Sequence, residues 1–333
     1  MHMRNKATLK NIANQLGISI STVSRALKDH PDIATSTKKK VRELADLMDF
    51  EPNAFAVYLR TNQSKVIGVI VPELSNFFYH SFVTSVEEEA RKMGYSLIIL
   101  QSANDPVVEE ANLKLCKLNR VAGIFVALTP ETKDLSPFDR INASGIPILF
   151  FDKVPDDNEY IKVCIADREV GKIAARAIIE SKRKKVFALF GNANLSITRK
   201  RKQGLVDELK TLSPFIDITT LTVNNSHDAK KVTIDMLKSN QRAEVIFCMS
   251  DEILTGVIMA IHQSGFVIPS DVGLLAISNG FVPKLMNPEI TYIETSGDQL
   301  GRRAMKTFGE VLEKGITKKL DIIESRLIKG GSL

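Results

Sequence analysis

From Lys65 onward, short apolar segments alternate with amphipathic helical segments, and this alternation constrains the fold more than any other feature of the sequence. We expect strands at 66–71, 96–100, 122–127, 147–151, 162–166, 185–190, 218–223, 244–249, 272–277 and 291–294. We expect helices at 78–93, 107–119, 168–181, 198–212, 228–240, 251–264 and 298–314. Near-continuous apolar strands separated by helices predict parallel sheets covered on both faces.

So many strands exceed one comfortable sheet, which predicts an α/β protein with two similar doubly wound parallel-sheet subdomains. We expect the break between them near 152–163, where the chain is acidic and contains Pro155. A return crossover is expected near 290–297, followed by a final strand near 321–327. Such sheets bind ligands outside the carboxyl ends of their strands, so the two subdomains predict a ligand-binding cleft.

Residues 1–50 have helical periodicity and contain no segment with the pattern of a strand. Thr8 is a plausible N-cap for a helix over 9–16, and Gly17 ends that helix. Ser19 then caps a second helix over 20–28, and a third is expected over 35–48. A helix, a short turn and a second helix that presents polar side chains outward are typical of a helix-turn-helix, whose second helix lies in the DNA major groove.

The side chains expected on that second helix suit a DNA groove. Arg25 can pair with a guanine, Ser21 can hydrogen-bond a base edge, and Ile20 can pack on a thymine methyl group. Thr22 and Ser24 can hold phosphates, and we expect three lysines to add positive charge: Lys6, Lys10 and Lys38. Residues 1–61 hold 10 of the 45 Lys and Arg but only 6 of the 39 Asp and Glu, which favours an anionic partner. The alternative is a helical module that docks a protein.

Several segments are similar to the LacI/GalR (lactose repressor) family. Thr8–Ala13, Leu16–Ser19 and Thr22–Leu27 resemble its DNA-binding module, and residues 51–60 resemble its hinge. Ile67–Pro72 with Ser75–Phe78 resembles the start of its sensor domain, and 268–272 and 300–304 match near the end. The resemblance implies a helix-turn-helix domain over 1–50, a hinge helix and linker over 51–64, and a periplasmic-binding-protein-like effector-binding and dimerisation domain over 65–333.

The resemblance also implies roles for individual residues. Ile20, Ser21 and Arg25 would read bases, while Leu59 would wedge into the minor groove with Arg60 near the groove floor. The complete DNA-binding set that we predict is Thr8, Ile20, Ser21, Thr22, Ser24, Arg25, Asn53, Leu59 and Arg60.

For the effector pocket we predict Ser75, Phe77, Asp152, Arg201, Ser250 and Asn279. Most of these residues lie near expected strand ends, where a helix N-cap is the alternative role. The family commonly has acidic residues where Ser278 and Asn279 stand, so this sequence departs from the pattern of a neutral-sugar site.

The sequence therefore predicts a ligand-responsive transcriptional repressor that binds a palindromic double-stranded DNA operator as a homodimer, with no tetramerising tail after Leu327. The alternative is a cytoplasmic carbohydrate- or nucleotide-handling enzyme with an accessory helical domain. However, the sequence contains no P-loop, dinucleotide-binding or nucleophile-elbow motif, and its five histidines lack metal-ligand spacing. We therefore expect no enzymatic activity, no cofactor and no metal.

Cellular location is inferred from the cysteines and the hydropathy. The three cysteines are widely spaced in apolar surroundings, which favours reduced thiols over disulfides. The N-terminus lacks the apolar core of a signal peptide, which a periplasmic binding protein would need. No apolar stretch is long enough to span a membrane. We therefore expect a cytoplasmic, nucleoid-associated protein with no membrane partner.

Overall fold

The computed structural model describes residues 8–50, 64–157, 159–240, 242–315 and 320–333, and the chain divides into two units at Ser64 and Lys65. The N-terminal unit contains three helices: α1 (Leu9–Leu16), α2 (Ile20–Leu27) and α3 (Thr35–Leu47). Their buried core consists of small and branched side chains, namely Ile12, Ala13, Val23, Ala26, Val41 and Ala45.

The caps expected for the first two helices are present. Thr8 Oγ1 accepts a hydrogen bond from the Asn11 amide at 3.2 Å, and Ser19 Oγ accepts one from the Thr22 amide at 3.1 Å. Gly17 adopts the left-handed region at φ 64°, which a residue without a side chain reaches at low cost. These caps fix the turn between α1 and α2 and so set the direction in which α2 presents its side chains.

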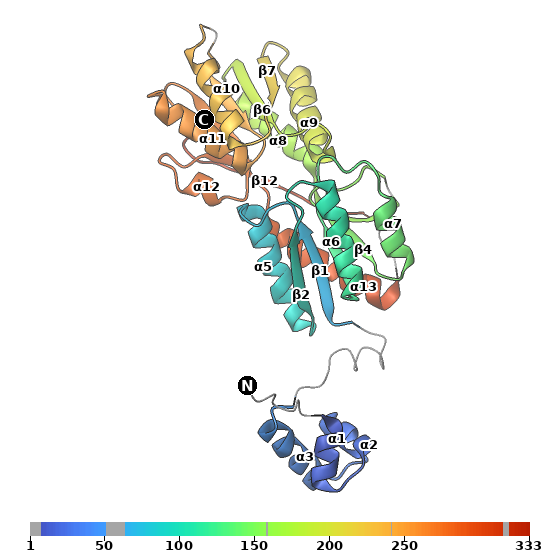
Figure 1. Ribbon diagram of the computed structural model, residues 1–333. Helices are drawn as coiled ribbons and strands as arrows, with labels where there is room; N and C mark the ends of the chain where they lie inside the picture. Colours follow the sequence, from blue (N-terminus) through green and yellow to red (C-terminus); the bar gives the residue numbers. More distant parts are fainter. Residues whose placement is uncertain (1–7, 51–63, 158, 241, 316–319) are drawn as a thin grey trace, which may run out of the picture. The chain divides into compact units, whose positions relative to one another are not determined.

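The C-terminal unit contains two six-stranded sheets, each with helices packed against it (Figure 1). The first sheet has the order β11-β5-β4-β3-β1-β2. Its strands are β1 (Val66–Val71), β2 (Ser96–Gln101), β3 (Gly123–Val126), β4 (Ile148–Phe151), β5 (Ile161–Ile165) and β11 (Leu320–Ile323). Its helices are α5 (Phe77–Lys92), α6 (Pro106–Leu118), α7 (Ser136–Ala143) and α13 (Gly297–Lys314).

The second sheet has the order β12-β10-β9-β8-β6-β7. Its strands are β6 (Lys185–Phe190), β7 (Asp217–Thr222), β8 (Val245–Cys248), β9 (Gly273–Ser278), β10 (Thr291–Glu294) and β12 (Arg326–Ile328). Its helices are α8 (Asp167–Glu180), α9 (Ser196–Leu212), α10 (Ser226–Lys238), α11 (Asp251–Gln263) and α12 (Phe281–Lys284). All pairings in both sheets are parallel except that of β10 with β12.

Alternating side chains of β1 explain why this sheet is covered on both faces. Ile67 and Val69 belong to the core under α5, whereas Ile70 belongs to the core under α6. Gly68 lies on the α6 face, where an added Cβ would come within 2.6 Å of Cys116 Sγ. The two-faced burial makes the strand continuously apolar, as the sequence indicated.

The expected break near 152–163 is wrong. β5 pairs in parallel with β4, so both strands belong to the first sheet, and the chain crosses to the second sheet only after Ile165, through α8. Neighbouring parallel strands are usually joined by a helix, but here a polar loop joins them, and the sequence of that loop resembles a linker. The chain returns to the first sheet between β10 and α13.

The single strand expected near 321–327 is also wrong, because the chain forms two short strands there. β11 completes the first sheet and β12 crosses to the second, with Glu324 and Ser325 between them. Two short helices, α7 and α12, were not expected from the sequence. None of the helices within the described ranges is long and apolar enough to cross a membrane.

Candidate functional site

The exposed face of α2 is the first candidate site, and it belongs to the N-terminal unit. Val23 and Ala26 are buried against the other two helices, which leaves Ile20, Ser21 and Arg25 exposed on the opposite face. Ile20 is 48% exposed, which is unusual for a large apolar side chain that only supports a fold. This arrangement is what a helix needs if it is to read base edges.

The remaining predicted DNA contacts differ in how accessible they are. Thr22 and Ser24 are half-buried, and the Thr22 hydroxyl lies 2.8 Å from Ser19 Oγ. Thr8 is exposed and caps α1. Asn53, Leu59 and Arg60 lie outside the described residues.

Lys38 is not a free phosphate contact, contrary to the sequence-based expectation. Its Nζ atom donates a hydrogen bond to the Asp29 carbonyl oxygen at 3.1 Å and lies 3.2 Å from the Asp29 carboxylate. The side chain is only 15% exposed. Lys38 therefore holds the segment after α2 against α3.

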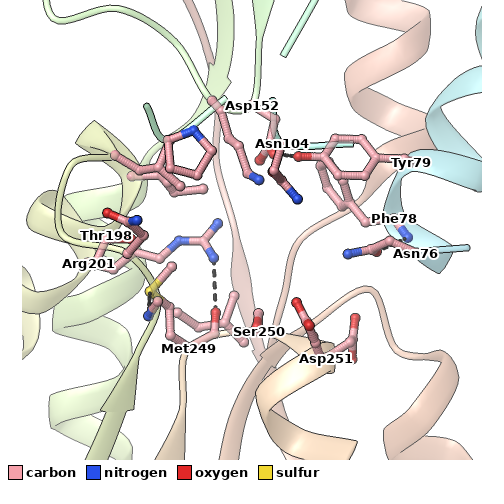
Figure 2. Close-up of a pocket in the computed structure, with 18 of the residues that line it drawn as sticks. Asn76, Phe78, Tyr79, Asn104, Asp152, Thr198, Arg201, Met249, Ser250 and Asp251 are labelled. Atoms are coloured by element: carbon pink, nitrogen blue, oxygen red, sulfur yellow. Dashed lines mark hydrogen bonds between the residues drawn. The ribbon is translucent and has the colours of Figure 1, made fainter. Parts of the chain in front are cut away.

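A second candidate site is a cavity of about 360 Å³ in the C-terminal unit, lined by residues from both sheets' loops and helices (Figure 2). Asp152 follows β4, Arg201 lies on α9 and Ser250 precedes α11, and the structure brings these three predicted residues together in the lining. Ser250 is also the N-cap of α11, because its hydroxyl accepts a hydrogen bond from the Ile253 amide. This cavity is of the size that holds a small ligand.

Three predicted residues do not line this cavity. Ser75 and Phe77 line a smaller adjoining cavity of about 250 Å³, and Phe78 takes the place expected for Phe77. The Asn279 side chain instead accepts a hydrogen bond from the Phe281 amide at 3.0 Å, and the Asn279 amide donates to Asp251. The ends of β8 and β9 are therefore tied to each other at this position.

A buried ion pair positions Arg201. Its Nε atom donates to Asp167 Oδ1 at 2.9 Å, and one terminal nitrogen donates to the Met249 carbonyl oxygen at 3.0 Å, as Figure 2 shows for the second bond. Burial raises the pKa of Asp167 to about 6, although the nearby guanidinium acts in the opposite direction. The pair fixes the guanidinium at the cavity wall, which is how a single arginine becomes a directional hydrogen-bond donor.

Asp152 is similarly oriented by a residue that we did not predict. The Tyr79 hydroxyl donates to Asp152 Oδ2 at 2.7 Å, and burial raises the pKa of Tyr79 well above its ordinary value. Lys153 also lines the cavity, and burial lowers its pKa while Asp152 opposes that shift. Lys153 could have been found from the sequence, because it directly follows the predicted residue Asp152. Nothing in the sequence marked Tyr79 as a residue of the cavity.

Thr198 and several further polar side chains belong to the part of the lining that the sequence did not identify. The hydroxyl of Thr198, on α9, has no hydrogen-bond partner although the residue is buried. The others are Asn104, Glu131, Asn192, Asn224, Glu252 and Thr295. Among the described residues, no group of three His, Cys, Asp or Glu side chains is arranged to hold a metal ion.

Comparisons with known proteins give a family match for each of the two units of the chain. Residues 8–53 match the family model of bacterial regulatory proteins of the lacI family. Residues 64–329 match the model of periplasmic binding proteins and the sugar-binding domain of the LacI family.

Curated relatives are similar along nearly their whole length. The chain is 26% identical over 306 residues to the HTH-type transcriptional repressor PurR of Mannheimia succiniciproducens, covering 91% of each chain. It is 26% identical over 343 residues to the protein of that name from Haemophilus influenzae strain PittEE, covering 97% of this chain and 98% of the relative.

Solved structures share the fold at lower sequence identity. The lac repressor dimer bound to operator and the anti-inducer ONPF matches with a TM-score of 0.88 and 19% identity, covering 98% of this chain and 99% of that one. The transcriptional regulator CelR in complex with cellobiose matches with a TM-score of 0.72 and 17% identity, with the same coverage.

Proposed function

Because the chain belongs to the LacI family of bacterial regulatory proteins, we propose that it represses transcription by binding a palindromic operator as a homodimer, under the control of a small-molecule effector. Membership in this family makes the chain a DNA-binding regulator rather than the sugar- or nucleotide-handling enzyme that the sequence left as an alternative. Its action is in the cytoplasm, on the nucleoid, where an operator is found.

The face of α2 carries the DNA-binding proposal. Ile20, Ser21 and Arg25 are exposed together on a helix whose other face is buried, and the position after a short turn is that of a recognition helix. Thr8, Thr22 and Ser24 support phosphate contacts around it, and Asn53, Leu59 and Arg60 extend the contact toward the centre of the operator. Base contacts specify the sequence, whereas phosphate contacts fix the orientation of the helix.

An exposed apolar stripe on α6 supports the homodimer. Val107, Leu115 and Leu118 are exposed, and with Ala111 they recur at the spacing that places them on one face of the helix. The neighbouring edge strand β2 adds Ile99, which is also exposed. An apolar face of this kind favours a second copy of the chain, and a palindromic operator requires a two-fold axis.

The effector occupies the cavity between the two sheets, held by Asp152, Arg201 and Ser250 together with Tyr79, Lys153 and Thr198. An effector that contacts both halves stabilises one relative arrangement of them. It can change the affinity for DNA by no more than the difference between its affinities for the two arrangements. Ser75 and Phe77 would lie at the mouth of this site.

The test is selection of operators from a random palindromic duplex pool, followed by gel-shift titration of the full-length protein at several salt concentrations. We expect a single preferred palindrome, two protomers per duplex, and a logarithm of affinity that falls linearly with the logarithm of salt concentration. Binding of equal strength to every duplex, or one protomer per site at saturation, would contradict the proposal.

A further inference from the structure

The lining of the effector cavity has an unequal charge balance. Among the described residues that line it, four carry a carboxylate and two carry a basic group: Glu131, Asp152, Asp251, Glu252, Lys153 and Arg201. Arg201 already pairs with buried Asp167, which lies behind the wall. Of the two cations in the described lining, Lys153 is therefore the one that offsets the four carboxylates of the cavity.

The adjoining cavity adds to this acidic character. It shares Asn76, Asp251 and Glu252 with the effector cavity and adds Glu73. No Lys or Arg belongs to the described residues that line it. Burial raises the pKa of Glu252, and the charge of Glu73 raises that pKa by more than Lys153 lowers it. The adjoining cavity therefore adds a carboxylate and no cation to the lining described for the effector cavity.

The unpartnered hydroxyl of Thr198 is an independent indication that a polar ligand belongs here. Thr198 is 2% exposed, its Oγ1 atom has no hydrogen-bond partner, and the residue lines the effector cavity on the side of Arg201 (Figure 2). A buried polar atom without a partner costs free energy, and a bound polar molecule would remove that cost.

The basic run 199–202 does not provide a cradle for an anion. Arg199 contacts the Asp156 carboxylate and donates to the carbonyl oxygens of Ala193 and Asn194. Lys202 is exposed, with its Nζ atom 5.8 Å from the centre of the Phe190 ring. Only Arg201 of this run lines the cavity.

We propose, on the basis of the effector role proposed above, that the effector is a small polar molecule that carries a positively charged amine, and not one that carries a phosphate or carboxylate. Closing the cleft around a ligand removes water from the carboxylates, and a ligand cation replaces the lost hydration. A phosphate or carboxylate would add like charge to a wall that already has an excess of it.

The test compares three probes that share a two-carbon hydroxyl body and differ in charge: ethanolamine, ethylene glycol and glycolate. Thermal unfolding midpoints of the full-length protein are measured against probe concentration at constant ionic strength. The pocket variant is Glu131→Gln with Glu252→Gln, and the matched control is Glu313→Gln with Glu324→Gln. All four glutamates are at least partly exposed to solvent, so both variants should fold, and both change the net charge equally.

We expect ethanolamine to raise the midpoint of the parent and the control more than ethylene glycol does, and glycolate to raise it least. The pocket variant should bind ethanolamine roughly tenfold more weakly and should lose the discrimination against glycolate. Equal responses of the two variants, including no response from either, overturn the proposal, as does a parent that prefers glycolate. Operator binding is measured in parallel with and without the probes, and its absence under every condition would contradict the proposed function instead.

Discussion

The rings of Phe77 and Phe281 stack with their centroids 3.9 Å apart and their planes inclined by 28°, although the two residues belong to different halves of the C-terminal unit. Phe77 begins α5 of the first half, and Phe281 begins α12 of the second. Phe77 also lines the cavity that adjoins the effector cavity. The stack therefore links the two halves directly, beside the cavity that adjoins the effector cavity.

Removing one of the two rings should make the contact between α5 and α12 open more often. An aromatic pair stabilises by about 0.5–1.5 kcal/mol, so Phe281→Ala should accelerate amide hydrogen exchange in the first turns of α5 and α12 by up to about tenfold. Phe281→Tyr keeps the ring and should exchange like the parent. An unchanged exchange rate in the alanine variant would show that the stack does not restrain opening.

Asp167 should make stability depend on pH. Its pKa is raised from 3.8 to about 6, so the folded state holds this proton more tightly than the unfolded chain. The resulting stabilisation is complete below pH 3.8 and is lost as the pH rises through about 6.

The measurement is urea unfolding of the parent and of Asp167→Asn across this range. From about pH 4 to pH 7 the unfolding free energy of the parent should fall relative to that of the variant, by on the order of 3 kcal/mol. Two curves that stay parallel over the whole range would show that Asp167 does not titrate in this window.

The close packing of α8 on α9 holds the Asp167–Arg201 pair in place and leaves no room at Gly204. A Cβ atom there would lie 2.0 Å from the Arg168 carbonyl oxygen, which is backbone and cannot rotate away. Gly204→Ala should therefore cost about 1–3 kcal/mol of unfolding free energy in urea titration. The control is Gly309→Ala on α13, where an added Cβ would meet the flexible end of Met93 at 3.4 Å. A Gly204 variant as stable as this control would contradict the close approach.

The alternation of strands and helices predicts the fold class, because periodicity reports which faces of each element are buried. The caps at Thr8 and Ser19 could also be predicted locally, since capping depends on residues only three positions apart. The sheet to which β5 belongs could not be predicted this way. A strand carries the same pattern whichever sheet it joins, and the polar loop before it resembles a domain linker.

The effector cavity was predicted only in part for a similar reason. Asp152, Arg201 and Ser250 line it because strand ends and helix starts meet at one edge of each sheet. Phe77 and Phe78 are adjacent at the start of α5 but point to different places, and only tertiary contacts decide which ring enters the cavity. Nothing in the sequence marks Thr198, because its distinguishing feature, a buried hydroxyl without a hydrogen-bond partner, exists only in the folded chain.

Substitution of Leu59 tests whether this residue contacts the centre of the operator. An apolar side chain inserted at a base step kinks DNA and widens the contact, so Leu59→Ala should weaken operator binding strongly while leaving ligand binding by the C-terminal unit unchanged. Gel-shift titration on the selected palindrome measures the first effect, and thermal stabilisation by a bound ligand measures the second. Equal operator affinity of variant and parent would exclude a wedge role for Leu59.

Arg25 and Lys10 separate base reading from charge. Both residues are exposed in the N-terminal unit, whereas Lys38 is tied to Asp29 and is unsuitable as the charge control. Arg25→Ala should cost about 1–3 kcal/mol on the preferred operator and relax the preference at one base pair of each half-site, because alanine cannot pair with a guanine. Lys10→Ala should weaken binding to all duplexes alike and reduce the salt slope by about one for each phosphate that the variant no longer binds.

Gel shifts on a series of operator variants at several salt concentrations distinguish the two effects. If Arg25→Ala instead weakens every duplex by the same factor, Arg25 contacts phosphate, and sequence reading must depend on Ile20 and Ser21.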